Sequence, residues 1–462
     1  MKIQNNLFIG IVLLVATSCG VVTKQYRRPE GLQSESLFRE MNSSDTVTIA
    51  DIPWEQLFKD PVLQGLIKQG LENNYDLKIA VARMQSAAAN LKQSKLAFLP
   101  SVSVSTNVSR VKSSSATTQN NSVNTLSELS GAASWELDIW GKLSSNKKAY
   151  VAAYMQSEAY RRAVQTQLIA TISGDYYQLL AYDEQIRIVE ATVKNREKDV
   201  EIVKTLKEGA VVTGADLMNS RVGLRTAALQ IPDLKQSRRK LENALSIILA
   251  LPPDSIARTT FEQQHIDSGL NVGISSQLLA NRPDVQQAEY AFRNAFELTN
   301  VARTYFYPSL TISGSGGWAT ANTLRDFFTN TFYGSLIGGL TQPIFNQGLN
   351  KQRLNNAEAT QLEAYYDFQK MLLSAGQEVS DALYAYDMAL ERDSIRQLQI
   401  IDLEKATEYT KELLRYSSST NYTDVLTAEQ NLLSARLNSV TDRLQQLQAV
   451  IELYRALGGG WK

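Results

Sequence analysis

The only cysteine and the only histidine of the 462-residue chain, Cys19 and His265, limit the chemistry that its side chains can perform. One residue of each type rules out a disulfide within the chain and a zinc site built from cysteine and histidine. A Ser–His–Asp triad needs only one histidine, but the residues around His265 show no such pattern. We therefore interpret His265 as a surface-loop residue, and we predict a protein that is not an enzyme and holds no cofactor or metal.

Cys19 has another chemistry available, because it follows what looks like a secretory signal. Lys2 precedes an apolar run over residues 7–16, and small residues separate this run from Cys19. These features are typical of a signal peptide, and the run is shorter than the roughly 20 residues of a membrane-spanning helix. The segment resembles the bacterial lipobox, whose cysteine is acylated and begins the mature protein. We predict a lipoprotein signal peptide over residues 1–18; the alternative is an ordinary signal peptide that contains a cysteine.

The charges of the chain balance, because Lys and Arg together number 47 and Asp and Glu together also number 47. Such a chain has no net field that would attract nucleic acid, so we expect no nucleic-acid partner. After residue 19 no apolar stretch is long enough for a membrane-spanning helix. If the exported chain crosses a membrane, we expect it to do so as a closed β-barrel.

The elements that would position any functional residue come in two copies of one unit. Residues 74–105 match 282–313 without a gap at an offset of 208, and the same offset returns where Asp216 matches Asp424. We expect each unit to form a helix, two strands, a very long helix, a turn and a second helix. The predicted helices cover residues 62–99, 142–208 and 215–250 in the first unit and 276–307, 349–416 and 422–457 in the second.

The predicted strands alternate apolar residues with small polar ones. Val102, Val104 and Val108 are separated by polar residues, mostly serine, and residues 131–140 also alternate. Alternation at period two indicates strands, and a small, uncharged polar face suits a wet lumen with lipid on the other side. Residues 113–125 between these strands are predicted to form a flexible loop.

The two long helices are the strongest structural signal. Residues 142–208 and 349–416 each contain one glycine and no proline. In the second, apolar residues recur in steps of three and four, which is typical of a coiled-coil seam. This seam consists of Leu362, Tyr365, Phe368, Leu372, Ala375, Val379, Leu383, Tyr386 and Leu390. Each helix would be a rod of about 100 Å. In the shorter helix 215–250, Pro232 is predicted to cause a kink.

Four strands per chain are too few to close a barrel in a membrane. Outer-membrane barrels start at about eight strands, and open strand edges cannot lie in lipid. Several chains must therefore pool their strands. Two chains would give a barrel filled by its own side chains, whereas three would leave room for a pore.

Segments in both units resemble those of the TolC-type outer-membrane efflux proteins, a family that includes the outer-membrane factor lipoproteins of resistance-nodulation-division pumps. The segments are Pro53–Leu63, Asn73–Leu77, Trp135–Lys142, Asn281–Val285, Pro343–Phe345 with Gly348, and Ala456–Trp461. The resemblance covers nearly the whole chain after residue 50. It implies an α+β membrane protein: a homotrimer whose 12-stranded β-barrel in the outer membrane, with four strands per chain, is continued by a long periplasmic α-helical barrel.

The resemblance also implies the function and the division of the chain. The trimer would be the passive exit duct of a tripartite efflux system, reached by drugs or other small molecules through a periplasmic adaptor and an inner-membrane transporter. The expected segments are the signal peptide 1–18, the lipid-anchored N-terminal and equatorial segment 19–60, the first efflux repeat 61–250, the equatorial linker 251–275, the second repeat 276–457 and the tail 458–462.

The resemblance places the periplasmic end of the duct at the turns that follow the long helices. The implied gate residues are Asp216, Thr420, Tyr422 and Asp424, and the implied adaptor contacts are Gly209, Gly214, Ser417 and Ser418. Some family members have a second acidic residue where this chain has Thr427, and many have a basic residue where it has Thr420. Alternatively, Asp216 and Asp424 only stabilise the first turns of their helices.

The main alternative to a duct is a lipid-anchored, secreted coiled-coil protein, either a structural rod or an adaptor without a pore. A rod of this kind would explain the long helices. It predicts neither the alternating Val/Ser strands nor their repetition, and an adaptor should contain β-rich lipoyl-like segments.

Overall fold

The computed structural model describes most of the chain after the N-terminus. The described residues are 22–29, 37, 48–112, 123–264, 278–320, 327–329, 331–416 and 422–462. Five residues singled out above lie outside these ranges: Cys19, His265, Ser417, Ser418 and Thr420. No helix in the described ranges is both long enough and apolar enough to cross a membrane.

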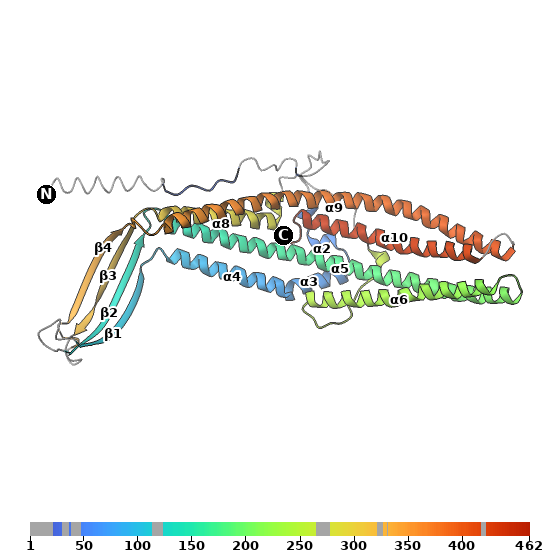
Figure 1. The fold of residues 1–462 in the computed structure, drawn as a ribbon, viewed down its shortest axis with the longest axis horizontal. Helices are drawn as coiled ribbons and strands as arrows, with labels where there is room; N and C mark the ends of the chain where they lie inside the picture. The colour runs from blue at the N-terminus through green and yellow to red at the C-terminus, as the bar shows by residue number, and fades with distance from the viewer. Residues whose placement is uncertain are drawn as a thin grey trace. The chain divides into compact units, whose positions relative to one another are not determined.

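The elements follow the predicted order in both units (Figure 1). The first half of the chain contains η1 Ile49–Asp51, α2 Trp54–Leu57, α3 Pro61–Asn73, α4 Tyr75–Leu96, β1 Ser101–Lys112, β2 Val123–Leu137, α5 Lys142–Glu208 and α6 Gly214–Ile248. The second half contains η2 Phe261–Gln263, α7 Leu278–Asn281, α8 Pro283–Thr304, β3 Ser309–Thr320, β4 Phe332–Thr341, α9 Leu349–Tyr416 and α10 Tyr422–Ala456.

Contacts divide the chain into two compact parts. The sheet part comprises Met1–Gly31, Arg83–Glu158 and Gln287–Gln369, and it contains all four strands. The helical part comprises Leu32–Ala82, Ala159–Gln286 and Lys370–Lys462. The two long helices α5 and α9 run from one part into the other.

The four strands form one antiparallel sheet in the order β1-β2-β3-β4. Residues that face one another across the strands share a side of the sheet, so the register assigns every side chain to a face. Val104 pairs with Gly131, which pairs with Gly316, whereas Ser105 pairs with Ser130, which pairs with Gly317. One face is therefore mainly apolar and the other is mainly serine, threonine and glycine.

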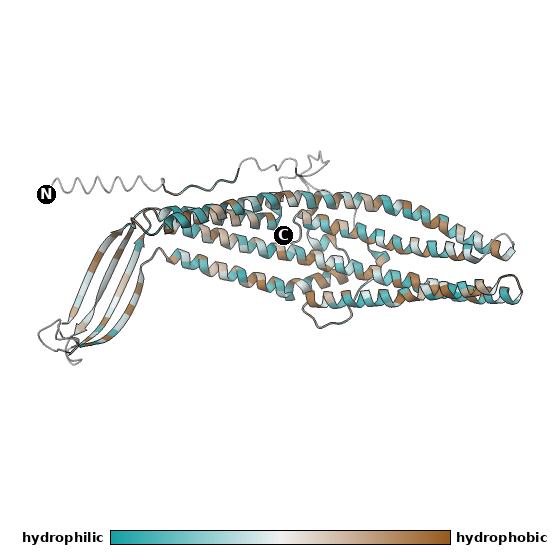
Figure 2. Ribbon diagram, in the orientation of Figure 1, coloured by the Kyte–Doolittle hydropathy of each residue, from teal (hydrophilic) through white to brown (hydrophobic). Residues whose placement is uncertain are grey.

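The apolar face carries large side chains that are open to solvent in the single chain. They include Val102, Val104, Val108, Leu336 and Leu340, which are 66–81 % exposed. Figure 2 shows hydrophobic residues recurring along the strands. On the polar face the hydroxyls of Ser315 and Ser335 lie 2.7 Å apart. The predicted division into an apolar and a small polar face is confirmed, and β2 begins earlier than predicted, at Val123.

The prediction of one continuous helix over residues 62–99 is wrong. The chain forms two helices there, α3 and α4, which are separated at Asn74. The Asn74 side-chain oxygen accepts a hydrogen bond from the Leu77 amide (3.0 Å) and so caps α4. Its amide donates to the carbonyl of Ile248 at the end of α6 (2.9 Å). This buried side chain ends one helix, begins the next and binds a third.

The second unit breaks at the equivalent position, so the predicted helix 276–307 is also wrong. Arg282, which is 208 residues after Asn74, separates α7 from α8. Its guanidinium donates to the carbonyl of Ala456 (3.0 Å), which is 208 residues after Ile248. The two units therefore use different side chains for the same contact.

The long helices have the predicted bounds, 142–208 and 349–416. Five residues of the predicted seam are buried: Phe368, Leu372, Ala375, Val379 and Tyr386. Two others, Leu362 and Leu390, are 51 % and 43 % exposed, so the seam is shorter than predicted. The shorter helix α6 continues through Pro232 without interruption.

Candidate functional site at the hairpin tips

Two helical hairpins end at the tips that the sequence singled out. In the first, α5 ends at Glu208 and α6 begins at Gly214, so the predicted contact residue Gly209 lies in the turn and Gly214 is the first helical residue. Ala210, not a glycine, has the left-handed backbone, with φ of 56°. In the second hairpin, α9 ends at Tyr416 and α10 begins at Tyr422.

Asp216 completes a capping box at the start of α6. Its carboxylate accepts hydrogen bonds from the backbone amide (2.8 Å) and the hydroxyl (2.7 Å) of Thr213, and its own amide donates to the Thr213 hydroxyl (3.2 Å). This capping box stabilises the first turn of α6. Asp424 lies in the first turn of α10 and is exposed. Neither position tests the gate roles, which stay predictions.

Tyr422, one of the implied gate residues, is buried between the helices. It is 3 % exposed and packs in an apolar cluster with Val200, Val203, Leu217 and Val425. Burial, with the nearby acidic residues, raises the pKa of its hydroxyl far above the ordinary value. The ring therefore stabilises the joint between the two hairpins of one chain, and the gate role of Tyr422 stays a prediction.

Four charged residues lie among the helices behind the tips, and the sequence did not reveal them. Arg196 and Asp199 come from α5, Lys411 from α9 and Glu429 from α10. Lys411 contacts Glu429 at 2.6 Å and Asp199 at 3.1 Å. The guanidinium of Arg196 lies 3.7 Å from the Glu429 carboxylate. We call this set the hairpin clamp, because it joins the first hairpin to the second.

Arg196 also reaches the fourth helix of the joint. Its Nη1 donates to the carbonyl of Gly223 in α6 (2.5 Å), and its Nη2 donates to the side chain of Gln430 in α10 (3.2 Å). A Cβ at position 223 would lie 2.5 Å from the terminal methyl of Leu426, so a larger residue here would require the leucine side chain to shift. All four tip helices therefore meet at the hairpin clamp.

The electrostatics of the clamp follow from its burial, since Arg196 is 2 % and Glu429 8 % exposed. Burial raises the pKa of Glu429, Asp199 adds to the rise, and Lys411 opposes it without cancelling it. Burial lowers the pKa of Lys411, but the hydrogen bond and charge of Glu429 and the charge of Asp199 outweigh it and raise that pKa. Lys411 therefore stays charged, and Glu429 takes up a proton more readily than an ordinary glutamate.

The clamp is not fully satisfied. Among the described residues, the Nε of Arg196 and the Oε2 of Glu429 are buried without a hydrogen-bond partner. A buried ion pair that lacks full hydrogen bonding offsets little of the cost of removing its charges from water. The joint thus combines a firm apolar cluster with an ionic contact that contributes little net stability.

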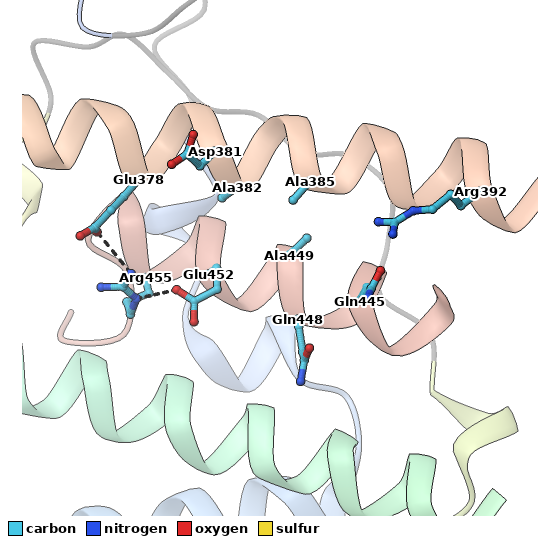
Figure 3. Close-up of a pocket in the computed structure, with 10 residues that line it drawn as sticks. All are labelled: Glu378, Asp381, Ala382, Ala385, Arg392, Gln445, Gln448, Ala449, Glu452 and Arg455. Atoms are coloured by element: carbon cyan, nitrogen blue, oxygen red, sulfur yellow. Dashed lines mark hydrogen bonds and ion pairs between the residues drawn. The ribbon is translucent and has the colours of Figure 1, made fainter. Parts of the chain in front are cut away.

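A groove between α9 and α10 lies further along the second hairpin (Figure 3). Its floor is made by small residues, Ala382, Ala385 and Ala449. At one end Arg455 pairs with Glu378 at 3.2 Å and with Glu452 at 2.8 Å. The Arg455–Glu378 pair joins α10 to α9, and it lies beside the Arg282 break, because Arg282 also contacts Glu378 at 2.9 Å.

The fold described above is that of solved outer-membrane channels. The outer-membrane channel OprN matches with a TM-score of 0.86 and 22 % identity over 95 % of this chain and 99 % of that chain. The open state of the Neisseria gonorrhoeae channel MtrE matches with a TM-score of 0.84 and 26 % identity over 95 % and 98 %.

Curated relatives and a family model point the same way. The probable efflux pump outer membrane protein TtgC of Pseudomonas putida is 27 % identical over 98 % of this chain and 95 % of the relative. The probable outer membrane lipoprotein SilC of Salmonella typhimurium is 29 % identical, with 97 % of each chain covered. The outer membrane efflux protein model matches residues 66–251 and 274–459. The chain belongs to the outer membrane efflux protein family, and it is an outer-membrane component of an efflux system.

Proposed function

We propose that three copies of this chain form a passive exit duct, anchored by lipid at Cys19, through which an inner-membrane transporter expels small molecules by way of a periplasmic adaptor. The observation that carries this proposal is the single antiparallel sheet with one apolar and one polar face. Its outer strands, β1 and β4, each have one neighbour within the chain. Unpaired edges and an exposed apolar face require other copies and lipid to cover them.

A second unpartnered surface supports assembly with further copies. Seven large apolar residues of α9 lie on the face opposite its buried seam, within about 40° of one direction at 100° per residue. This outer stripe consists of Leu373, Tyr384, Ile395, Leu398, Tyr409, Leu413 and Tyr416, all 44–85 % exposed. A helix that is apolar on two opposite faces is normally buried on both.

A complementary surface lies on α6. Met218, Val222, Leu229 and Ile247 also share one face of their helix and are 49–68 % exposed. Because the two stripes are on different helices, the stripe on α9 of one copy can pair head to tail with that on α6 of the next. Head-to-tail contacts close into rings when the rotation between copies permits it. A ring of three would supply 12 strands, enough for an open lumen.

Such a duct performs no chemistry. In the described residues no group of three or more His, Cys, Asp and Glu side chains is placed to hold a metal ion. The hairpin tips would contact the adaptor, and separation of the hairpin clamp would accompany opening. The names of several relatives mention toluene, antibiotics or pyoverdine, which are small molecules of different chemistry, so we assign no single substrate.

The test is the mass of the purified protein in detergent, corrected for bound detergent, together with conductance in planar bilayers. We expect three chains and discrete conductance steps. Replacing Leu398 by Glu should prevent assembly, because a charge would be buried in the contact. Glu408→Gln, at an exposed position of the same helix about 110° away from the stripe, is the control and should still assemble. A monodisperse monomer that does not conduct would favour the pore-free coiled-coil protein.

A further inference from the structure

The polar face of the sheet has charges of one sign only. Among the strand residues that the structure describes, the register places two charged side chains on this face, Glu128 and Glu136, and both are acidic. The basic residues of the strands, Arg110 and Lys112, lie on the apolar face. If the polar face lines a lumen, the charges that the described strands bring to it are carboxylates.

The two carboxylates differ in their partners. Glu136, near the helices, accepts hydrogen bonds of 2.9 and 3.2 Å from the ammonium of Lys142, which neutralises it. Glu128 has no cationic partner in the described part of the chain, and it accepts a hydrogen bond from the hydroxyl of Tyr333. Among the described residues the carboxylate of Glu128 is therefore not paired with a cation, and a phenol fixes its position.

The register explains how a residue of β4 reaches a residue of β2 across the intervening strand. Tyr333 pairs with Gly317 of β3, and Gly317 pairs with Ser130 of β2, two residues from Glu128. A side chain at position 317 would lie 2.2 Å from the backbone oxygen of Leu129, so this position requires glycine. Gly317 therefore places no side chain on β3 between Tyr333 and the strand that carries Glu128.

We propose that Glu128, positioned by Tyr333, is a specificity-determining residue that makes the duct favour cationic solutes over anionic ones. This inference rests on the proposed trimeric duct, in which three copies would form a ring of three carboxylates. Glu128 lies nine residues before the end of β2 at Leu137. At the rise of a β-strand this is about 30 Å from the helices, so the ring lies toward the far end of the sheet.

The dimensions allow such a ring to act on the whole lumen. Twelve strands about 4.8 Å apart and tilted by about 40° enclose a barrel about 24 Å across between backbones. Side chains that project about 5 Å inward leave roughly 14 Å of water. The screening length is about 10 Å at 0.1 M salt. At or below this salt concentration, the field of three carboxylates covers the width of the lumen and attracts cations.

The test is the reversal potential of the full-length protein in planar bilayers across a gradient of dilute KCl. We expect Glu128→Gln to lower the ratio of potassium to chloride permeability by at least about twofold, while the conductance steps and the trimer mass stay unchanged. Tyr333→Phe, which frees the carboxylate without removing its charge, should lower the ratio less. Arg110→Gln, which removes a charge from the apolar face, is the matched control that should leave the ratio as it is in the wild type.

The outcomes separate this inference from the proposed function. An unchanged permeability ratio in a conducting Glu128→Gln trimer would overturn the inference and leave the duct intact. A control variant that shifts the ratio as much as Glu128→Gln would also overturn it. Absence of conductance in the wild-type protein would instead refute the duct.

Discussion

Substitution of Arg196 should weaken the hairpin clamp more than substitution of its other residues, because Arg196 contacts both α6 and α10 from α5. Replacing it by Gln leaves the carboxylate of Glu429 buried with Lys411 as its remaining cationic partner. We expect the free energy of unfolding to fall by about 3 kcal/mol and the channel to conduct for a larger fraction of time. Circular dichroism on heating and single-channel recording measure the two effects.

The matched control for Arg196 is Arg221 in α6, which is exposed. Arg221→Gln should change neither the melting temperature nor the open fraction. If Arg196→Gln melts earlier but conducts as the wild type does, the clamp stabilises the chain without controlling opening.

Asp424 carries the gate prediction drawn from the sequence. It is exposed in the first turn of α10, where it also suits the helix dipole. If three copies of Asp424 face a narrow lumen, Asp424→Asn should preserve the closed state and lower cation selectivity. If the residue only stabilises its helix, the Asn variant should melt slightly earlier with unchanged selectivity. Combining Asp424→Asn with Glu128→Gln distinguishes two rings in series, since their effects on the reversal potential should add.

At the scale of elements, Asn74 provides a test of the break that the sequence did not predict. Asn74→Ala removes the cap of α4 and leaves the carbonyl of Ile248 without this donor. We expect the free energy of unfolding to fall by about 2–3 kcal/mol, the sum of a lost cap and an unpaired buried carbonyl. The neighbouring Asn73→Ala is the control in denaturant titrations. An equal effect of both changes would contradict the assigned role of Asn74.

The elements that could be predicted are those whose signals are local. The bounds of α5 and α9 follow from long runs free of proline that end at turns, and the alternation of β1 follows from its valines and serines. The breaks at Asn74 and Arg282 could not be predicted, because their cause is a carbonyl that lies 174 residues away in each unit. No local propensity records such a contact.

The position of the site along the chain could be predicted from the sequence, but the residues of the hairpin clamp could not. The tips lie where the turns and the repeat put them, and Asp216 has a recognisable capping pattern with Thr213. The hairpin clamp escaped prediction since Arg196 and Glu429 are far apart in the chain and each lies in a helix rich in exposed charges. The weak signal was position: both occur on faces that otherwise carry apolar or small residues.

At the scale of the whole molecule, the predicted lipid anchor at the N-terminus can be tested directly. Cys19 follows a signal-like segment, and the relative SilC is named as an outer membrane lipoprotein. We expect mass spectrometry of the mature protein to show an acylated Cys19 as its first residue. Cys19→Ser should leave an unacylated protein that is recovered less completely with the membrane fraction. An unmodified N-terminus at another residue in the wild type would exclude the lipid anchor.

The open edges of the sheet also determine how assembly should proceed in time. A pair of copies buries one β1 edge and one β4 edge and still presents the other two, so it is no better protected than a single chain. The third copy closes both remaining edges in one event. Dimers should therefore be short-lived species, and the rate of channel formation should rise steeply with the concentration of newly exported chains. The ring becomes stable only when the third copy binds, so its formation should be nearly all-or-none.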